Sequence, residues 1–247
     1  MKRILTFFVL FFLFYIPHLF AQGPTLRVAV AHNFPPFVMR GANSQFYGFD
    51  IAMMNYICKT LDRPCRFIPM DFVQLLNAVI EGKADVAVSS ITITVERSQI
   101  VNFSIPYLPS KSHFLAGPDT PVQNFSLDLI NGKRVGVETG TIFSNQLEQM
   151  GAKNVEKVSY AREDDIIQAL SDGEIDFALV DAEAAVYWQS YTTGILKVIG
   201  PPFPHGFGYG IVISKDNLNL LTSINQALKN YIQSEEYKKN VRMYIEY

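Results

Sequence analysis

A strand–helix–strand pattern that occurs twice is the feature that most constrains how this chain can fold. Residues 78–88 (AVIEGKADVAV) closely parallel residues 169–179 (ALSDGEIDFAL), and each segment is typical of a helix end, a glycine, a short turn and an apolar strand. Upstream, residues 26–30 (LRVAV) have a counterpart in residues 133–137 (KRVGV), and each predicts a strand leading into a helix. Alternating strands and helices favour parallel α/β layers. Their repetition predicts two similar lobes, and a single continuous α/β domain is the alternative.

The first 21 residues are typical of a secretory signal peptide. Lys2 and Arg3 precede residues 4–20, which contain no charged side chain, and Ala21 offers a small residue for cleavage. An uncleaved membrane anchor is the alternative, because the apolar run approaches the length that spans a bilayer. The short basic flank and the interruption at Pro17 favour cleavage after Ala21.

The chain that remains after cleavage is mildly acidic. Removing residues 1–21 leaves 226 of 247 residues, with 19 Lys and Arg against 23 Asp and Glu, a net charge of −4. This balance argues against nucleic acid or anionic lipid as a partner. The length allows one large domain or two modest ones.

Both cysteines, Cys58 and Cys65, remain in the processed chain, with six residues between them. A metal site would need more ligands, and a redox motif would need closer spacing. For an exported protein we therefore expect a structural disulfide, which stabilises by about 2–3 kcal/mol on the chain-entropy model.

The residues just after the predicted strands hold the most concentrated chemistry, because open α/β sheets bind ligands beyond the carboxyl ends of their strands. Ser90 and Thr92 follow one strand, and Thr94 suits the N-cap of a helix that begins at Val95. Backbone N–H groups and hydroxyls are then presented to an anion. Arg97, three residues beyond Thr94, can hold a carboxylate with two parallel hydrogen bonds.

The second half of the chain offers a complementary set. Gly140 and Thr141 supply further N–H donors, and Asp181 ends an apolar strand and suits an ammonium group. Together with Arg97 these residues fit a zwitterion. Taken singly, Arg97 can be a surface helix residue and Asp181 a helix cap.

Aromatic side chains offer flat walls for a ligand. We expect Phe34 and Phe72 to line the site, and Phe37 to belong to the core, where most phenylalanines lie.

Seven motifs in order resemble the periplasmic polar amino-acid-binding proteins of ABC importers, the group that includes the lysine/arginine/ornithine- and glutamine-binding proteins. The resemblance covers the whole chain after the signal peptide. It rests on residues 34–37 (FPPF), 48–51 (GFDI), 70–72 (MDF), 89–97 (SSITITVER), 101–104 (VNFS), 136–141 (GVETGT) and 176–181 (DFALVD).

The resemblance implies a role for each candidate. Phe34 and Phe72 would sandwich the ligand side chain. Ser90, Thr92 and Arg97 would take its α-carboxylate, with a further donor from Thr141 in the second lobe, and Asp181 would take its α-ammonium. Cys58 and Cys65 stand where the binders of cationic amino acids carry a disulfide.

Three departures from the family pattern bear on the ligand. Ala31 stands where an acid often faces the ligand's cationic end, Ile142 replaces a common hydroxyl residue, and Glu138 is an unusual acid at a pocket-lining position. A buried cation needs a partner, so we expect Glu138 to substitute for the missing acid and the ligand to be cationic, arginine first. The alternative is that Glu138 faces solvent and the ligand is neutral, such as glutamine.

The family fold implies two lobes joined by two crossover strands. We expect residues 25–111 plus 206–247 to form lobe 1, residues 112–205 to form lobe 2, and a hinge near residues 107–113 and 204–208. Ligand contacts from both lobes would stabilise the closed form. The expected partners are an amino acid and a membrane-embedded ABC permease, and we expect a periplasmic monomer without cofactor or metal.

An enzyme is the main rival class. Residues 22–247 have three histidines, His32, His113 and His205, and carry no metalloprotease, serine-hydrolase or phosphate-loop motif, so we expect no catalytic residue. The same fold hosts cyclohexadienyl and arogenate dehydratases, in which an acid such as Glu138 would protonate a leaving group. A third class, the sensor module of a receptor kinase or a peptidoglycan lyase, predicts a membrane helix or catalytic domain after Tyr247.

Overall fold

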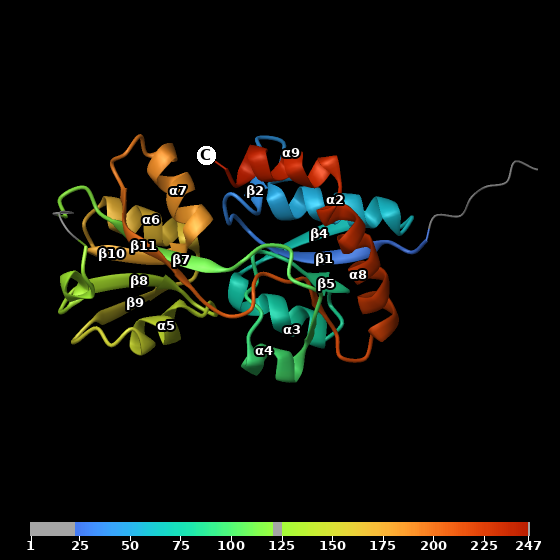
Figure 1. Ribbon diagram of the computed structural model, residues 1–247, viewed down its shortest axis with the longest axis horizontal. Helices are drawn as coiled ribbons and strands as arrows, with labels where there is room; N and C mark the ends of the chain where they lie inside the picture. The colour runs from blue at the N-terminus through green and yellow to red at the C-terminus, as the bar shows by residue number, and fades with distance from the viewer. Residues whose placement is uncertain (1–22, 121–124, 247) are drawn as a thin grey trace, which may run out of the picture.

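Two α/β units lie side by side in the computed structural model, which describes residues 23–120 and 125–246 (Figure 1). The predicted signal peptide lies outside the described residues. Within them, no helix is both long enough and apolar enough to cross a membrane.

We call the unit that contains both ends of the described chain lobe 1, and the other unit lobe 2. Lobe 1 contains β1 (Leu26–Ala31), β2 (Met39–Arg40), β3 (Phe46–Tyr47), α2 (Phe49–Thr60), β4 (Cys65–Met70), η2 (Phe72–Gln74), α3 (Leu75–Ile80), β5 (Val86–Ala87), α4 (Val95–Ile100), β6 (Asn102–Phe103), β12 (Val212–Ile213), α8 (Leu218–Ile232) and α9 (Glu235–Tyr244). Lobe 2 contains β7 (Lys111–Ala116), η3 (Leu127–Ile130), β8 (Arg134–Glu138), α5 (Phe143–Gln149), β9 (Glu156–Tyr160), α6 (Glu163–Ser171), β10 (Phe177–Asp181), α7 (Ala182–Tyr191) and β11 (Lys197–Pro204).

Each lobe is built on a mixed five-stranded sheet. The orders are β4-β1-β5-β12-β6 in lobe 1 and β11-β7-β10-β8-β9 in lobe 2. The strands of the predicted repeat pair in parallel, β1 with β4 and β5 in lobe 1, and β8 with β9 and β10 in lobe 2. The strands that enter from the other lobe, β7 and β12, add antiparallel pairs. The repeated strand–helix–strand units are therefore confirmed.

The same ionic brace holds the repeat in both lobes. In lobe 1 the Asp85 carboxylate accepts hydrogen bonds from the backbone N–H of Arg27, at 2.8 Å, and from its guanidinium. In lobe 2 Asp176 does the same for Arg134, with the backbone bond at 2.9 Å. Each arginine also donates to the carbonyl of the turn glycine, Gly82 or Gly173. The repeat seen in the sequence is thus a repeat in contacts.

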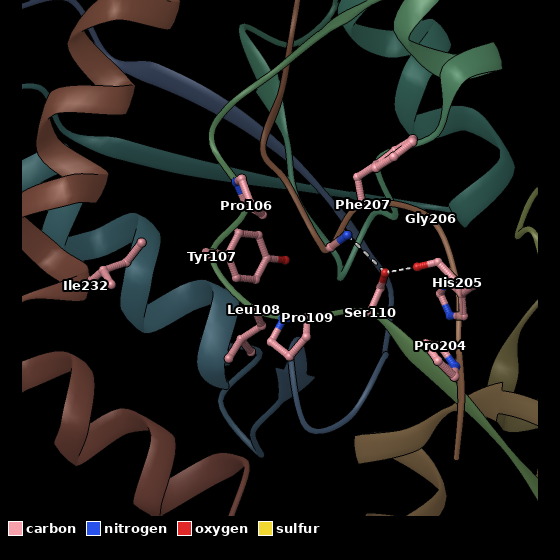
Figure 2. A pocket seen from close by; sticks show the side chains of 11 residues that line it. Pro106, Tyr107, Leu108, Pro109, Ser110, Pro204, His205, Gly206, Phe207 and Ile232 are labelled. Carbon is pink, nitrogen blue, oxygen red and sulfur yellow. Dashed lines mark hydrogen bonds between the residues drawn. The ribbon is translucent and has the colours of Figure 1, made fainter. Parts of the chain in front are cut away.

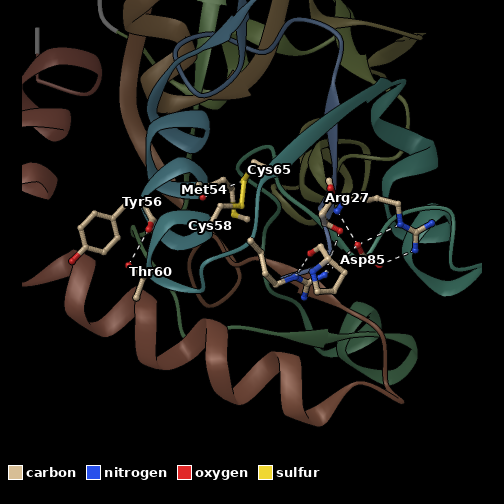
Figure 3. Close-up of a disulfide and its surroundings, with 10 residues drawn as sticks. Arg27, Met54, Tyr56, Cys58, Thr60, Cys65 and Asp85 are labelled. Carbon is tan, nitrogen blue, oxygen red and sulfur yellow. Dashed lines mark hydrogen bonds and ion pairs between the residues drawn. A yellow bond between two sulfur atoms is a disulfide. The ribbon is translucent and has the colours of Figure 1, made fainter. Parts of the chain in front are cut away.

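The predicted disulfide is present and ties α2 to β4. Cys58 in the last turn of α2 is bonded to Cys65 at the start of β4, with their Cα atoms 5.7 Å apart (Figure 3). The bond closes the loop between these elements on the side of lobe 1 where Arg27 and Asp85 also lie.

Two chain segments connect the lobes, and they are bonded to each other. The Ser110 hydroxyl donates to the carbonyl of His205 and accepts from the backbone N–H of Gly208 at 3.1 Å (Figure 2). Backbone bonds join the two segments in the same place: the Tyr209 N–H donates to the Leu108 carbonyl at 2.9 Å, and the Tyr209 carbonyl accepts from the Tyr107 N–H at 3.0 Å. A hollow of about 450 Å³ lies against these segments, with mostly apolar walls. The two connections therefore run as a pair.

Candidate functional site

The loop after β5 positions the groups of lobe 1 that were predicted to bind an anion. Ser90 has a positive φ of 41°, and its backbone N–H donates to Asp50 Oδ2 at 2.8 Å. Thr94 caps α4 as predicted, because its hydroxyl accepts from the Arg97 N–H at 3.2 Å. This cap fixes the first turn of α4, from which the Arg97 side chain leaves.

The Arg97 guanidinium bridges the two lobes. It donates to the carbonyl of Thr92 in lobe 1 at 2.8 Å and to the carbonyl of Gly140 in lobe 2 at 2.9 Å. Its Cζ atom lies 5.8 Å from the centre of the Phe72 ring, within the range of a cation–π contact. Burial lowers the pKa of Arg97 to about 10, against the opposing effect of the Asp181 and Glu96 charges. Arg97 therefore stays a cation at neutral pH.

Asp181 ends β10 and faces lobe 1. Its carboxylate accepts from the Ser90 hydroxyl at 2.8 Å and from the Tyr209 hydroxyl at 2.8 Å. Burial raises the pKa of Asp181 to about 8, with a further rise from the charge of Glu183, while the two hydrogen bonds lower it. A cationic group placed here would favour the ionised form of Asp181.

Glu138 is the last residue of β8, and the charge of Asp181 influences it. Only 5% of the residue is exposed, and its Oε2 atom has no hydrogen-bond partner among the described residues. Its backbone is held by Thr141, whose hydroxyl donates to the Glu138 carbonyl at 2.6 Å. Burial raises the pKa of Glu138 well above its ordinary value, and the charges of Glu163, Asp181, Asp164 and Asp71 raise it further. Glu138 thus lies in an acidic environment and does not face bulk solvent.

The two aromatic candidates touch each other directly. Phe34 and Phe72 stack with their ring centres 5.5 Å apart and their planes at 25°. A ligand side chain can lie between them only if the rings separate. Phe37 is fully buried in the core against Phe49 and Tyr209, as expected.

A small cavity between the lobes brings most of the candidates together. Its volume is about 10 Å³, which is roughly the space that one water molecule needs. An amino acid can therefore enter only if the lobes move apart. The cavity is lined by Phe34, Phe72, Ser90, Thr92, Arg97, Thr141, Ile142, Phe143 and Asp181. Of the eight predicted ligand contacts, Glu138 is the one that is not on this wall.

Several residues around the site were not predicted. Tyr209 binds Asp181, and Asn33 donates to Asp164 across the lobes at 2.9 Å. Glu163 is buried and accepts from the Trp188 indole N–H at 2.6 Å. Glu163 and Asp164 follow β9, so the rule that strand ends carry the chemistry would have found them if applied to this strand. Tyr209 gave no such signal, because its partner is 28 residues away in sequence.

No group of three or more His, Cys, Asp or Glu residues that could hold a metal ion occurs within residues 23–120 and 125–246. The groups at the site are a guanidinium, hydroxyls, backbone dipoles and carboxylates, which are suited to binding a small charged solute.

The fold and the site define a two-lobed solute-binding protein, and comparisons with known proteins give its family. The model of the bacterial extracellular solute-binding proteins, family 3, matches residues 26–247. The chain belongs to this family, as its motifs predicted.

Characterised relatives and a solved structure agree with this assignment. The chain is 31% identical over 242 residues to the lysine/arginine/ornithine-binding periplasmic protein of Escherichia coli strain K12, covering 92% of this chain and 90% of the relative. It is 32% identical over 218 residues to ABC transporter arginine-binding protein 1 of the same strain, covering 87% and 88%. The arginine 3rd transport system periplasmic binding protein from Legionella pneumophila is 31% identical, with a TM-score of 0.83 over 90% of this chain and 100% of that one. The predicted two-lobed fold is thereby confirmed.

Proposed function

We propose that this protein closes on a cationic amino acid, arginine first, and delivers it to an ABC importer. The observation that carries the proposal is the charge of the site. Arg97 is the one basic side chain among the described residues that line the cavity, whereas Asp181 lines it and Glu138 lies buried close by. A zwitterionic backbone uses one positive and one negative protein group, Arg97 and Asp181. Glu138 then remains for a second positive charge on the ligand.

The contacts of the cavity wall give each part of the ligand a partner. Ser90, Thr92 and Arg97 would hold the α-carboxylate, with a donor from Thr141, and Asp181 would hold the α-ammonium. Phe34 and Phe72 would separate to take the aliphatic part of the side chain. Glu138 would face its cationic end, which supplies the partner that Glu138 Oε2 lacks among the described residues.

Binding would be coupled to closure of the lobes. Several bonds already span them, among them Ser90 to Asp181, Arg97 to Gly140, Asn33 to Asp164, Arg162 to Asp71 and Tyr209 to Asp181. A ligand in contact with both lobes adds further bonds that only the closed form makes, so it shifts the equilibrium towards closure. The paired connections at residues 107–113 and 204–208 would act as the hinge between residues 25–111 plus 206–247 and residues 112–205.

The relatives support a binding protein over an enzyme. The E. coli proteins are named for binding lysine, arginine and ornithine, and the matching relatives described above are binding proteins. A dehydratase on this fold is therefore not favoured. By the same likeness, this chain would be exported to the periplasm after cleavage of residues 1–21 and would bind its permease as a monomer.

The first experiment is a thermal-shift screen of the twenty amino acids with ornithine and citrulline. A ligand that binds only the native state raises the melting temperature with the logarithm of its excess over Kd. We expect arginine to give the largest shift, with smaller shifts for lysine and ornithine. If the melting temperature of the wild type does not change with arginine, lysine or ornithine but rises with a neutral amino acid, Glu138 has another role.

The charge test is Glu138→Gln, measured by calorimetry. Losing the carboxylate should weaken arginine binding about 10- to 100-fold, the usual size for a lost hydrogen bond to a charged group, and should spare any glutamine binding. Glu156→Gln is the matched control, because Glu156 is exposed at the opposite end of the paired strands β8 and β9. Its arginine affinity should stay within about twofold of wild type.

A further inference from the structure

A second buried acid, Glu163, lies beside the site and has no place in the predicted ligand set. It is the first residue of α6 and is only 1% exposed. Its Oε1 atom accepts a hydrogen bond from the Trp188 indole N–H at 2.6 Å. A carboxylate oxygen has two lone pairs, so this carboxylate keeps most of its capacity to accept further bonds.

Glu163 and Glu138 lie close enough to influence each other. The parallel pairing of β8 and β9 places Glu138 opposite Tyr160, and α6 begins three residues after Tyr160. Burial is the main cause that raises the pKa of Glu138, and the charge of Glu163 is the second largest. The pKa of Glu163 itself is raised well above its ordinary value, mainly by burial.

The neighbouring acids already have partners, whereas Glu138 and Glu163 have no cationic partner in the part of the chain that the structure describes. Asp71 pairs with Arg162 and His32, and Asp164 accepts from Asn33. No described Lys or Arg forms an ion pair with Glu138 or Glu163. Two neighbouring buried carboxylates without a cation are unfavourable, and a cation bound between them relieves both the burial and the repulsion.

The number of donors distinguishes the possible cations. A guanidinium is planar, spreads its charge and carries five N–H donors in a fixed fork, so it can bond two carboxylates at once. An ammonium is a compact point charge that holds its water more strongly. We infer that Glu138 and Glu163 form a two-carboxylate site for a guanidinium group, with Trp188 as the residue that positions Glu163. This inference rests on the proposed function and narrows its ligand to guanidinium compounds.

The test compares arginine with lysine on wild type and Glu163→Gln by calorimetry. The variant keeps an oxygen that can accept the Trp188 N–H, so the fold should be retained. Arginine affinity should fall about 10- to 100-fold and lysine affinity only about threefold, because the ammonium depends less on a second carboxylate. Asp165→Asn is the matched control: it removes an exposed acid from the same helix turn and should leave the ratio of arginine to lysine affinity unchanged.

A second variant gives an independent readout. Trp188→Phe removes the N–H that donates to Glu163 and keeps an aromatic ring against Tyr191. In the wild type the ring centres of Trp188 and Tyr191 lie 5.6 Å apart. It should lower the preference for arginine over lysine in the same direction, by about three- to tenfold, the usual range for one hydrogen bond.

The outcomes separate the two proposals. If wild type binds arginine but Glu163→Gln weakens arginine and lysine equally, or leaves arginine within twofold, the two-carboxylate site is wrong and the proposed function stands. If wild type binds no cationic amino acid, both proposals are wrong.

Discussion

The two lobes share a scaffold but differ in what they bring to the site. Both carry the same strand–helix–strand unit and the same arginine–aspartate brace, Arg27 with Asp85 and Arg134 with Asp176. At the ends of equivalent strands, however, lobe 1 presents hydroxyls, backbone N–H groups and Arg97, whereas lobe 2 presents carboxylates, Glu138 and Asp181.

Their interiors differ as well. Lobe 1 has a single apolar core that includes Cys58 and the C-terminal helices. Lobe 2 has two clusters, because alternate residues of β7 and β10 face opposite sides of its sheet: Leu115 and Val180 belong to one cluster, and Phe114 and Leu179 to the other. The scaffold can therefore be repeated while the charge at the strand ends is changed independently. Under the proposed function, a solute with a carboxylate at one end and positive charge at the other would bind between two such lobes.

The largest loss of ligand affinity should come from removing the guanidinium of Arg97 in lobe 1. If Arg97 holds the ligand carboxylate in the closed site, Arg97→Ala leaves that charge buried and unpaired, and affinity should fall by about 2–5 kcal/mol, or about 30-fold to several thousand-fold. Arg97→Lys should recover little of the lost affinity, because an ammonium cannot make the bidentate hydrogen bonds of a guanidinium. Calorimetry on both variants, with the exposed Arg66→Ala as control, measures this. An Arg97→Ala affinity within threefold of wild type would show that lobe 1 does not bind the carboxylate.

Removing the disulfide tests whether this covalent cross-link, which lobe 2 lacks, stabilises lobe 1. Replacing Cys58 and Cys65 together by serine should lower the free energy of unfolding by about 2–3 kcal/mol. For a protein of this size that corresponds to a melting temperature about 4–12 °C lower. Calorimetric melting should give the same decrease for reduced wild type. Arginine affinity should change less than twofold, and a larger change would mean that the α2–β4 loop reaches the site.

A smaller loss of affinity than for Arg97→Ala is expected at Gly140, a point where the lobes touch. Gly140 in lobe 2 has φ +87°, and a Cβ atom there would lie 2.7 Å from the Cα of Val73 in lobe 1. Gly140→Ala should therefore hinder closure and weaken arginine about tenfold, with a smaller ligand-induced decrease in the radius of gyration by small-angle scattering.

Gly173→Ala is the matched control for this test. Gly173 also has a positive φ, of 73°, but nothing lies within 4 Å of the added atom. Both variants should lose about 1–3 kcal/mol of stability from backbone strain. Equal arginine affinities in the two variants would mean that the Gly140 contact is not part of the liganded form.

The sequence predicted the elements of the site better than their arrangement. The cap at Thr94, the bond between Cys58 and Cys65, and the burial of Phe37 follow from local patterns, and the structure contains all three. The Phe34–Phe72 stack was not predicted, since it brings together two side chains from separate segments of lobe 1. The position of Glu163 after β9 was a local signal, but its burial and its bond to Trp188, 25 residues further along the chain, follow from no local pattern.

The sequence by itself determined the two α/β lobes and the chemistry at their strand ends, because hydrophobic periodicity, turn glycines and helix caps act over a few residues. The tertiary structure decided which of those groups meet. Ser90 reaches Asp181 across 91 positions, and Asn33 reaches Asp164 across 131. It also decided that Glu138 and Glu163 are both buried without an ion pair to any described Lys or Arg, since burial and charge depend on every element packed around a residue.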